Sequence, residues 1–224
     1  EILAGIRKDI PGTVKFIFQP AEEGAPLGEE GGATLMVKEG VMDKPKVDAI
    51  FGLHAWPGLI GTAQYRSGPT MAAAERMRIT VTGVQTHGAK PWGGVDPIVV
   101  SSQIIMSLQT IVAREVDITE VPAVVTIGSI HGGVRNNIIP EEVVMEGTIR
   151  TFKKEIRDQI HTSIKDKVEM IASASGAKAK VEIFSNIAKV TYNEPSLTEQ
   201  MLPSLRRVYG KENVFVRPFV TGAE

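Results

Sequence analysis

Two kinds of apolar periodicity alternate through the middle of the chain. Four segments carry apolar residues at alternate positions or as a short β-branched run, which is typical of strands. Two further segments carry apolar residues three and four positions apart, which is typical of helices that pack on one side. The strands are expected at residues 76–82, 123–130, 143–149 and 179–183, and the helices at residues 97–112 and 156–171.

In chain order these elements follow β-α-β-β-α-β, the ferredoxin-like pattern. An antiparallel sheet of this type carries both helices on one face. Asp96 followed by Pro97 predicts an N-cap with proline in the first turn, and Gly176 predicts the end of the second helix. We therefore expect residues 71–187 to form a separate α+β domain.

The segments before this domain predict another architecture. Residues 13–19 and 47–54 are continuous apolar runs, as expected for parallel strands that are covered on both faces. Residues 31–40 between them are expected to include a short helix. Residues 1–70 are therefore expected to form the first part of an α/β domain.

The same α/β architecture is expected to resume after the inserted domain. Ser196 and Glu199 have the spacing of a capping box, which predicts a helix that begins at Ser196 and ends at Val208. Residues 214–216 are apolar and β-rich, which predicts a short strand. Residues 188–224 would then complete the α/β domain, so the predicted fold class is α/β with an inserted α+β domain.

The composition is that of an ordinary globular protein, with 42% hydrophobic and 23% charged residues among 224. The formal net charge of -1 favours neither nucleic acid nor an anionic membrane, so we expect neither as a partner. No apolar run is expected to reach the length of a transmembrane helix. The lack of cysteine excludes disulfides and thiolate metal sites within the chain. The cytoplasm is the default expectation, and export stays open because a signal would lie upstream of Glu1.

Two adjacent carboxylates follow the first apolar run. Glu22 and Glu23 come directly after Gln-Pro-Ala, and His54 ends the second apolar run. Functional groups are often held on loops that follow rigid elements. A carboxylate and an imidazole at two strand ends are suitable ligands for zinc or a similar metal, while the neighbouring carboxylate handles a proton. The alternative is that the acid pair is solvated surface and His54 a hydrogen-bonded structural residue.

The other three histidines have simple structural alternatives. His87 lies in a loop before a Pro-Trp-Gly-Gly turn, where it would be solvent-exposed without a role. His131 would only cap a strand. His161 falls on the polar side of the second helix of the inserted domain, beside Arg157 and Lys165, and is expected to be solvated.

Several sequence blocks together carry a family resemblance. They are Phe18-Gln-Pro-Ala-Glu-Glu-Gly24, Gly52-Leu-His54 with Trp56-Pro57, Thr86-His-Gly-Ala-Lys-Pro91 with Asp96-Pro97, Gly132-Gly133 with Asn137-Ile-Ile-Pro140 and Gly147-Thr-Ile-Arg-Thr-Phe152, and Thr221-Gly-Ala-Glu224. In this order they resemble the metal-dependent amidohydrolase and metallopeptidase family of aminoacylases, hippurate hydrolases, indole-acetyl-amino-acid hydrolases and carboxypeptidase-G-type enzymes. The resemblance implies a zinc-peptidase-like α/β catalytic domain with an inserted ferredoxin-like lid, and a homodimer formed through that lid.

Matched residue by residue, Glu22 resembles the general acid/base, Glu23 a metal ligand and His54 a ligand of the second metal. The implied cofactors are two divalent ions per full-length subunit, zinc first, with manganese, cobalt or nickel as alternatives. The implied substrate is a hippurate-like N-acyl amino acid. Its amide bond would be hydrolysed by metal-activated water, with Glu22 as general base.

Three lid residues also match family positions. His87 resembles the lid histidine that stabilises the oxyanion in the partner subunit's site. Asn137 and Arg150 resemble positions that contact the substrate, and a guanidinium offers a carboxylate a planar, two-pronged fork. The alternatives are that Asn137 is a turn residue and Arg150 an exposed charge at a strand end.

The family's upstream Cys/His block and its C-terminal histidine have no counterpart in these residues. Glu23 and His54 alone give two metal ligands, whereas a catalytic zinc usually has three, so we expect no activity from this stretch by itself. Within the family, a dipeptidase or carboxypeptidase is the alternative function. Outside enzyme chemistry, the alternative is a non-catalytic dimerisation or binding module.

Overall fold

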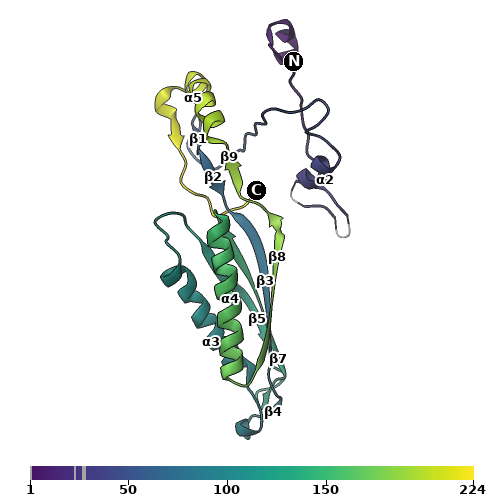
Figure 1. The fold of residues 1–224 in the computed structure, drawn as a ribbon, viewed down its shortest axis with the longest axis vertical. Helices are drawn as coiled ribbons and strands as arrows, with labels where there is room; N and C mark the ends of the chain where they lie inside the picture. Colours follow the sequence, from purple (N-terminus) through teal and green to yellow (C-terminus); the bar gives the residue numbers. More distant parts are fainter. Residues whose placement is uncertain (1, 23, 27–28) are drawn as a thin grey trace. The chain divides into compact units, whose positions relative to one another are not determined.

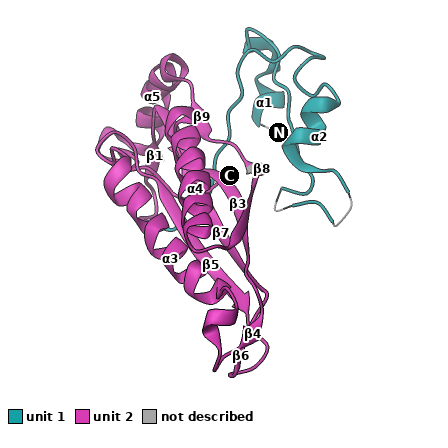
Figure 2. Ribbon diagram, turned by 60° about the horizontal axis from the view of Figure 1, so that its bottom comes forward, with its two compact units in different colours: residues 1–57 teal, residues 58–224 magenta. Residues whose placement is uncertain are grey.

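The computed structural model describes residues 2–22, 24–26 and 29–224 of the chain. Two compact units are formed, residues 1–57 and residues 58–224, and Figure 2 shows them in different colours. The helical elements of the first unit are α1 (Ile2–Gly5), the 3-10 turn η1 (Arg7–Asp9) and α2 (Gly32–Lys38).

The first unit differs from the prediction in its strands. The short helix predicted within residues 31–40 is confirmed as α2, but residues 13–19 and 47–54 form no strand. Their apolar side chains are largely exposed, as at Phe18 (84%) and Leu53 (91%). A run of apolar residues indicates that a segment favours burial, but it does not by itself make the segment a strand. A strand also needs a hydrogen-bonded neighbour, and neither segment has one among the described residues.

The second unit holds most of the regular structure (Figure 1). We call its main portion the two-layer part. Its elements are β3 (Ala73–Thr82), α3 (Pro97–Thr110) continued by the π-helical turn η3 (Ile111–Glu115), β5 (Val124–Gly132), β7 (Glu142–Thr151), α4 (Lys154–Ala174) and β8 (Lys178–Ala188). The short strands β4 (Thr86–His87) and β6 (Ile138–Ile139), with the 3-10 turn η2 (Pro91–Gly93), lie at one end of this part.

The two-layer part has the predicted ferredoxin-like order. Its sheet runs β5-β7-β3-β8, and each neighbouring pair is antiparallel. In the central pair, Ala73 is opposite Thr151 and Thr82 is opposite Glu142. Helices α3 and α4 cover one face of the sheet and leave the other face open (Figure 1).

An apolar core lies between the helices and the sheet. Alternation along β3 places Met77, Ile79 and Val81 on the covered face, and each is 0% exposed. The helices contribute the residues of their inner stripes, namely Val100, Ile104, Leu108, Ile160, Ile164 and Val168. Full burial of such side chains contributes about 2 kcal/mol each, so this core is the main source of stability in the second unit.

One helical stretch is more apolar than the sequence analysis expected. Pro97–Glu115 is long and apolar enough to cross a membrane by length and composition alone, and about a third of it is buried in the structure. The buried positions of α3 pack on the sheet as part of the core. This packing accounts for the apolar inner side of the helix.

The ends of the two core helices follow the predicted signals. The carboxylate of Asp96 accepts hydrogen bonds from the amides of Ile98 (2.8 Å) and Val99 (3.4 Å), which confirms it as the N-cap of α3. Helix α4 is followed by Gly176 in the left-handed conformation, with φ of +73°. The predicted C-terminal stop is thereby confirmed.

The predicted cap of the last helix is wrong. Helix α5 (Pro195–Tyr209) begins before Ser196, and Glu194 is its N-cap. The Glu194 carboxylate accepts hydrogen bonds from the amides of Ser196 (3.1 Å) and Leu197 (2.6 Å). Because Pro195 takes the first helical position, the capping role moves to the residue before it.

A smaller layer and a connecting ribbon complete the second unit. We call β1 (Ala63–Tyr65), β10 (Val214–Val216) and α5 the small layer; β1 and β10 pair in parallel, which confirms the strand predicted at 214–216. Strands β2 (Gly68–Met71) and β9 (Thr191–Asn193) pair antiparallel between the small layer and the two-layer part. The predicted domain boundaries, after residues 70 and 187, fall near this ribbon and stay a prediction.

Candidate functional site

Glu22 follows a backbone position that is strained. Ala21 has a φ of +51°, a left-handed conformation that costs a residue with a Cβ roughly 1–2 kcal/mol. The amide of Gly24 donates to the Ala21 carbonyl (3.2 Å), and the amide of Gly32 donates to the Pro20 carbonyl (3.1 Å). Strain of this kind clusters at functional sites, so the turn favours a functional role for Glu22.

Two glycines at the start of α2 allow this turn to pack closely. A Cβ added to Gly31 would lie 3.0 Å from the Cβ of Ala21, and one added to Gly32 would lie 3.3 Å from the Ala21 carbonyl oxygen. Gly32 also has a φ of +66°, which a residue with a side chain rarely adopts. The exposed Glu22 side chain therefore extends from a turn whose backbone is packed against the start of α2.

Of the two predicted metal ligands, the structure describes His54 but not Glu23. His54 is exposed, and its Nδ1 lies 2.5 Å from the carbonyl oxygen of Ala55. When Nδ1 donates to that carbonyl, the lone pair that a metal binds is on Nε2. Carboxylate and imidazole fit a zinc-like ion, but the described residues contain no group of three or more His, Cys, Asp or Glu that would hold one.

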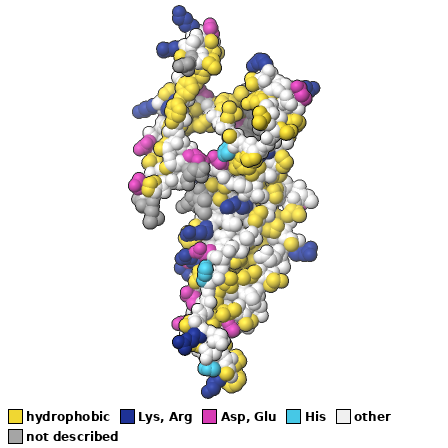
Figure 3. Space-filling view, turned by 180° about the vertical axis from the view of Figure 1, so that it is seen from behind, with side chains coloured by type: hydrophobic (Ala, Val, Ile, Leu, Met, Phe, Trp, Pro, Cys, Tyr) yellow, Lys and Arg dark blue, Asp and Glu magenta, His cyan; other side chains and the backbone are white. Residues whose placement is uncertain are grey.

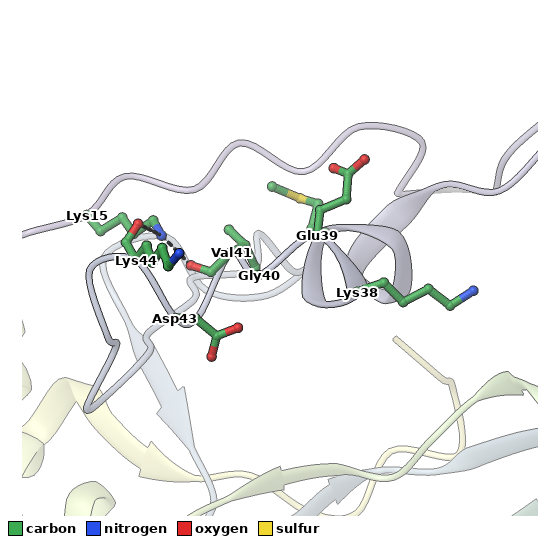
Figure 4. A pocket seen from close by; sticks show the side chains of 8 residues that line it. Lys15, Lys38, Glu39, Gly40, Val41, Asp43 and Lys44 are labelled. Carbon is green, nitrogen blue, oxygen red and sulfur yellow. Dashed lines mark hydrogen bonds between the residues drawn. The ribbon is translucent and has the colours of Figure 1, made fainter.

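A pocket of about 560 Å³ lies beside α2 in the first unit, and Figure 4 shows it at close range. None of the predicted site residues lines it. The ammonium group of Lys15 donates hydrogen bonds to the carbonyl groups of Val41 and Lys44, the latter at 3.0 Å. Lys38 pairs with Glu30 at 2.8 Å. These two lysines are satisfied within the unit, so we do not place the predicted site in this pocket.

His87 and Asn137 lie together at one end of the second unit. Strand β4 pairs with β6 so that His87 is opposite Ile138, and the amide of Gly88 donates to the Asn137 carbonyl at 2.8 Å. The Nδ1 of His87 accepts a hydrogen bond from the amide of Ala89 at 3.0 Å. In the neutral ring Nε2 then carries the proton, which is the arrangement an oxyanion donor needs.

Arg150 lies in the four-stranded sheet, near the end remote from the β4–β6 pair. It is paired with Ala74, whereas Glu142, at the end of β7 next to β6, is paired with Thr82. The stretch of antiparallel strand from Glu142 to Arg150 spans roughly 27 Å. Within one chain, the structure therefore brings His87 and Asn137 together and separates both from Arg150.

The open face of the sheet carries ordered charged side chains, and Figure 3 views the molecule from that side. The Nη2 of Arg78 lies 2.6 Å from the Oε1 of Glu146. Its hydrogen bond and positive charge lower the pKa of the Glu146 carboxyl. The guanidinium of Arg76 lies 4.6 Å over the ring of Phe184. Strand alternation puts Arg150 on this same face.

The sequence analysis missed a buried acid, Glu75 on β3. It is 2% exposed, and its Oε2 lies 2.7 Å from the Nε2 of His161 on α4. The prediction that His161 is simply solvated is therefore wrong. The other oxygen of Glu75, Oε1, is buried without a hydrogen-bond partner in the structure as described. The alternation along β3 would have predicted this burial, because Glu75 is two residues before Met77 and lies on the same inward face as Met77 and Ile79.

Comparison with known proteins places this geometry in a family. The profile of peptidase family M20/M25/M40 matches residues 1–224. The chain is 40% identical over 174 residues to the N-acetyl-L-cysteine deacetylase of Bacillus subtilis, covering 77% of this chain and 40% of that protein. It is 35% identical over 202 residues to thermostable carboxypeptidase 2 of Saccharolobus solfataricus, covering 89% and 49%. A solved Bacillus subtilis structure, described as a dinuclear metal binding peptidase from the M20 family, matches with a TM-score of 0.77 at 32% identity, covering 99% and 53%.

The chain belongs to peptidase family M20/M25/M40. This result confirms the family resemblance, and the structural match confirms the α/β fold class. The chain spans about half the length of the curated relatives it matches, from 40% to 54%.

Proposed function

We propose that the full-length protein is a metal-dependent amidohydrolase that cleaves the amide bond of N-acyl amino acids. The proposal is carried by the family match over the whole chain, together with the fixed turn that presents Glu22. Relatives are named as deacetylases of N-acetylcysteine and N-acetyldiaminopimelate and as an N-acyl-L-amino acid amidohydrolase. The products would be a carboxylic acid and a free amino acid.

Glu23 and His54 are the residues of this chain that would hold the two divalent ions, with further ligands from the rest of the full-length protein. Zinc is the first expectation, with manganese, cobalt or nickel as alternatives, because geometry and supply decide among them. When bound, such ions supply Lewis acidity and make water a stronger acid.

Glu22 would perform the proton transfers. It would take a proton from the attacking water and later pass it to the nitrogen of the leaving amine. This role requires a carboxylate beside the metal and not on it. The fixed backbone around Ala21 and Gly32 favours such a role, because it sets the direction of the side chain without using the carboxylate as an anchor.

His87 would donate a hydrogen bond from Nε2 to the negatively charged oxygen that forms when water adds to the amide carbonyl, worth roughly 3 kcal/mol of barrier lowering. Asn137, on the same end of the unit, would contact the substrate beside it. Arg150 would bind the substrate carboxylate through its planar fork.

These three roles require two chains. Arg150 lies roughly 27 Å of strand away from the end that carries His87 and Asn137, so one small substrate does not reach both within a chain. We assign His87 to the site of a second copy, as the family resemblance implies, and Asn137 to that same site because it lies beside His87. The functional protein is then a homodimer, with the two-layer part as its lid and dimerisation domain.

A carboxypeptidase or dipeptidase is the second candidate, because thermostable carboxypeptidases are also among the relatives. The test uses purified full-length protein with divalent metal, and it measures amine release from N-acetyl and N-benzoyl amino acids and from dipeptides. We expect kcat/KM to be at least about tenfold higher for the N-acyl substrates. A preference for dipeptides would support the second candidate. No release from any substrate would support a non-catalytic dimerisation or binding module.

A further inference from the structure

Three segments of the chain meet between the small layer and the two-layer part. Strand β2 pairs with β9, and Met71 at the end of β2 forms a parallel bridge with Val220. The amide of Val220 donates to the Thr70 carbonyl (3.0 Å), and the amide of Ala72 lies within hydrogen-bond distance of the carbonyls of Val220 (3.0 Å) and Gly222 (2.9 Å). Residues 217–222 therefore join β2 and β9 as a third segment of the connecting ribbon.

Arg66 contacts all three segments, two of them through its guanidinium and the third through its backbone carbonyl. Its Nε donates to the Pro69 carbonyl at 3.1 Å, and its Nη1 donates to the Arg217 carbonyl at 2.9 Å. Its own carbonyl accepts a hydrogen bond from the Nδ2 of Asn193 at 2.8 Å. The carbon of its guanidinium lies 3.6 Å from the centre of the Phe219 ring.

The contact with Phe219 continues into the core of the two-layer part. The rings of Phe219 and Phe152 meet edge to face, with centres 4.8 Å apart. Phe152 is 3% exposed and directly follows β7, two residues after Arg150. Arg66, Phe219 and Phe152 therefore form a continuous stack. It leads from Arg66, which directly follows β1 of the small layer, to the apolar core of the two-layer part.

Arginine is the residue type that this position requires. The guanidinium donates in two directions within its own plane while its face stacks on an aromatic ring. A lysine keeps the charge but has a single ammonium group, so it cannot hold two carbonyls and cover the ring at once. The contacts therefore depend on the shape of Arg66 and not only on its charge.

We propose that Arg66 is a positioning residue, which fixes the orientation of the two-layer part relative to the small layer through the Phe219–Phe152 stack. This inference rests on the proposed function in one respect: the two-layer part carries His87, Asn137 and Arg150, so its orientation sets where these side chains meet the substrate. A displacement of about 1 Å is enough to cost up to 100-fold in rate.

The structural test measures the distance between α4 of the two-layer part and α5 of the small layer. Spin labels are attached through unnatural amino acids introduced at Met170 in α4 and Val208 in α5, both largely exposed (62% and 75%), so that native cysteines stay in place. The labelled full-length protein is exchanged with an excess of unlabelled subunits, so that a dimer carries one labelled chain. The unmodified background should give one narrow distance distribution. Arg66→Lys, and independently Phe219→Leu, should broaden or shift it. Arg76→Lys is the matched control, because that arginine also stacks on a ring but within the sheet, and it should leave the distribution narrow.

The kinetic test uses the same variants with an N-acyl amino acid. We expect Arg66→Lys to lower kcat by about tenfold or more at unchanged metal content, and Arg76→Lys to leave kcat within about twofold. An unchanged distance distribution in both ribbon variants, or an unchanged kcat in Arg66→Lys, overturns the proposal. If the wild-type protein hydrolyses no substrate, the proposed function fails, whereas the distance measurement still decides the role of Arg66 in orientation.

Discussion

The backbone amide of Gly88 donates a hydrogen bond to the backbone carbonyl of Asn137 across 2.8 Å. This contact ties the loop that carries His87 to the turn that carries Asn137. A Cβ at position 88 would lie 3.2 Å from the carbonyl carbon and oxygen of Asn137, so a side chain there would require the Asn137 backbone to shift by a few tenths of an ångström. The backbone segments that carry His87 and Asn137 are therefore held side by side at the end of the two-layer part.

Replacement of Glu22 by glutamine should nearly abolish turnover in the full-length protein and leave its metal content unchanged. The amide cannot accept the proton of the attacking water, while the metal ligands are untouched. Turnover and bound metal per subunit are measured on the same sample. Glu30→Gln is a suitable control, because Glu30 is a nearby surface acid paired with Lys38. Loss of stoichiometric metal in Glu22→Gln would contradict the division of roles between Glu22 and Glu23.

Replacement of His87 by alanine should lower kcat far more than it raises KM. The expected loss is about 100-fold or more, because an oxyanion donor acts in the transition state and not on the bound substrate. Steady-state kinetics with one N-acyl substrate separate the two constants. A change in KM alone would make His87 a binding residue.

Mixing inactive subunits tests whether His87 acts across the dimer. If it does, Glu22→Gln and His87→Ala subunits mixed in equal amounts should recover about a quarter of wild-type activity, because each mixed dimer contains one intact site. Activity is measured after the dimers have exchanged subunits. Recovery should fail if each chain builds its site alone, and that result would contradict the two-chain arrangement.

Removal of the His161 side chain should destabilise the protein strongly. His161→Ala leaves the carboxyl group of Glu75, which is 2% exposed, without its hydrogen-bond partner, at a cost of about 1–3 kcal/mol. A double replacement by leucine at positions 75 and 161 should recover much of this loss, because it removes both polar groups. Urea unfolding measures the free energies. His131→Ala, on the exposed part of β5, is the control, and an equal effect there would contradict the account.

The hydrogen bond from Ser163 to Glu115 should make part of the stability depend on pH. The Ser163 hydroxyl (2.6 Å) and then the charge of Lys167 hold the pKa of Glu115 below its ordinary value of 4.5. Because the folded pKa is lowered, this stabilisation is present above about pH 4.5 and is lost as pH falls through the lower folded value.

Ser163→Ala should therefore lower the free energy of unfolding by about 1 kcal/mol at pH 7 and by less once Glu115 is protonated. Urea unfolding at pH 7 and at pH 3 gives the two differences. Thr162→Ala is the matched control, because the Thr162 hydroxyl donates to the Asp158 carbonyl and should have the same effect at both pH values. An undiminished effect of Ser163→Ala at low pH would contradict the assignment.

The two-layer part was predictable because its signals are local. The alternation of Met77, Ile79 and Val81 fixes a buried strand face, and Asp96 and Gly176 mark helix ends through contacts within one turn. Each of these features depends on residues that are close in the sequence. Their order then determined the sheet topology, because few arrangements of such units are possible.

Apart from the local error at the N-cap of α5, the features that the sequence analysis got wrong or missed concern contacts between residues that are distant in the sequence. Residues 13–19 have the composition of a buried strand, but strand formation depends on a neighbour that the run itself does not specify. The pairing of His161 with Glu75 joins a helix flank to an inward strand position, and the Arg66 contacts join three separate segments. Periodicity shows which face each side chain occupies, but it does not show which side chain lies opposite.

The central claim is that metal and the Glu22 turn together hydrolyse an N-acyl amino acid. The most direct measurement follows amine release by the gently purified full-length protein, before and after removal of divalent ions by a chelator and after their return. The account predicts about two bound divalent ions per subunit, loss of hydrolysis with the chelator and recovery with zinc or manganese. A protein that contains no divalent ions and shows no hydrolysis when they are added would contradict it.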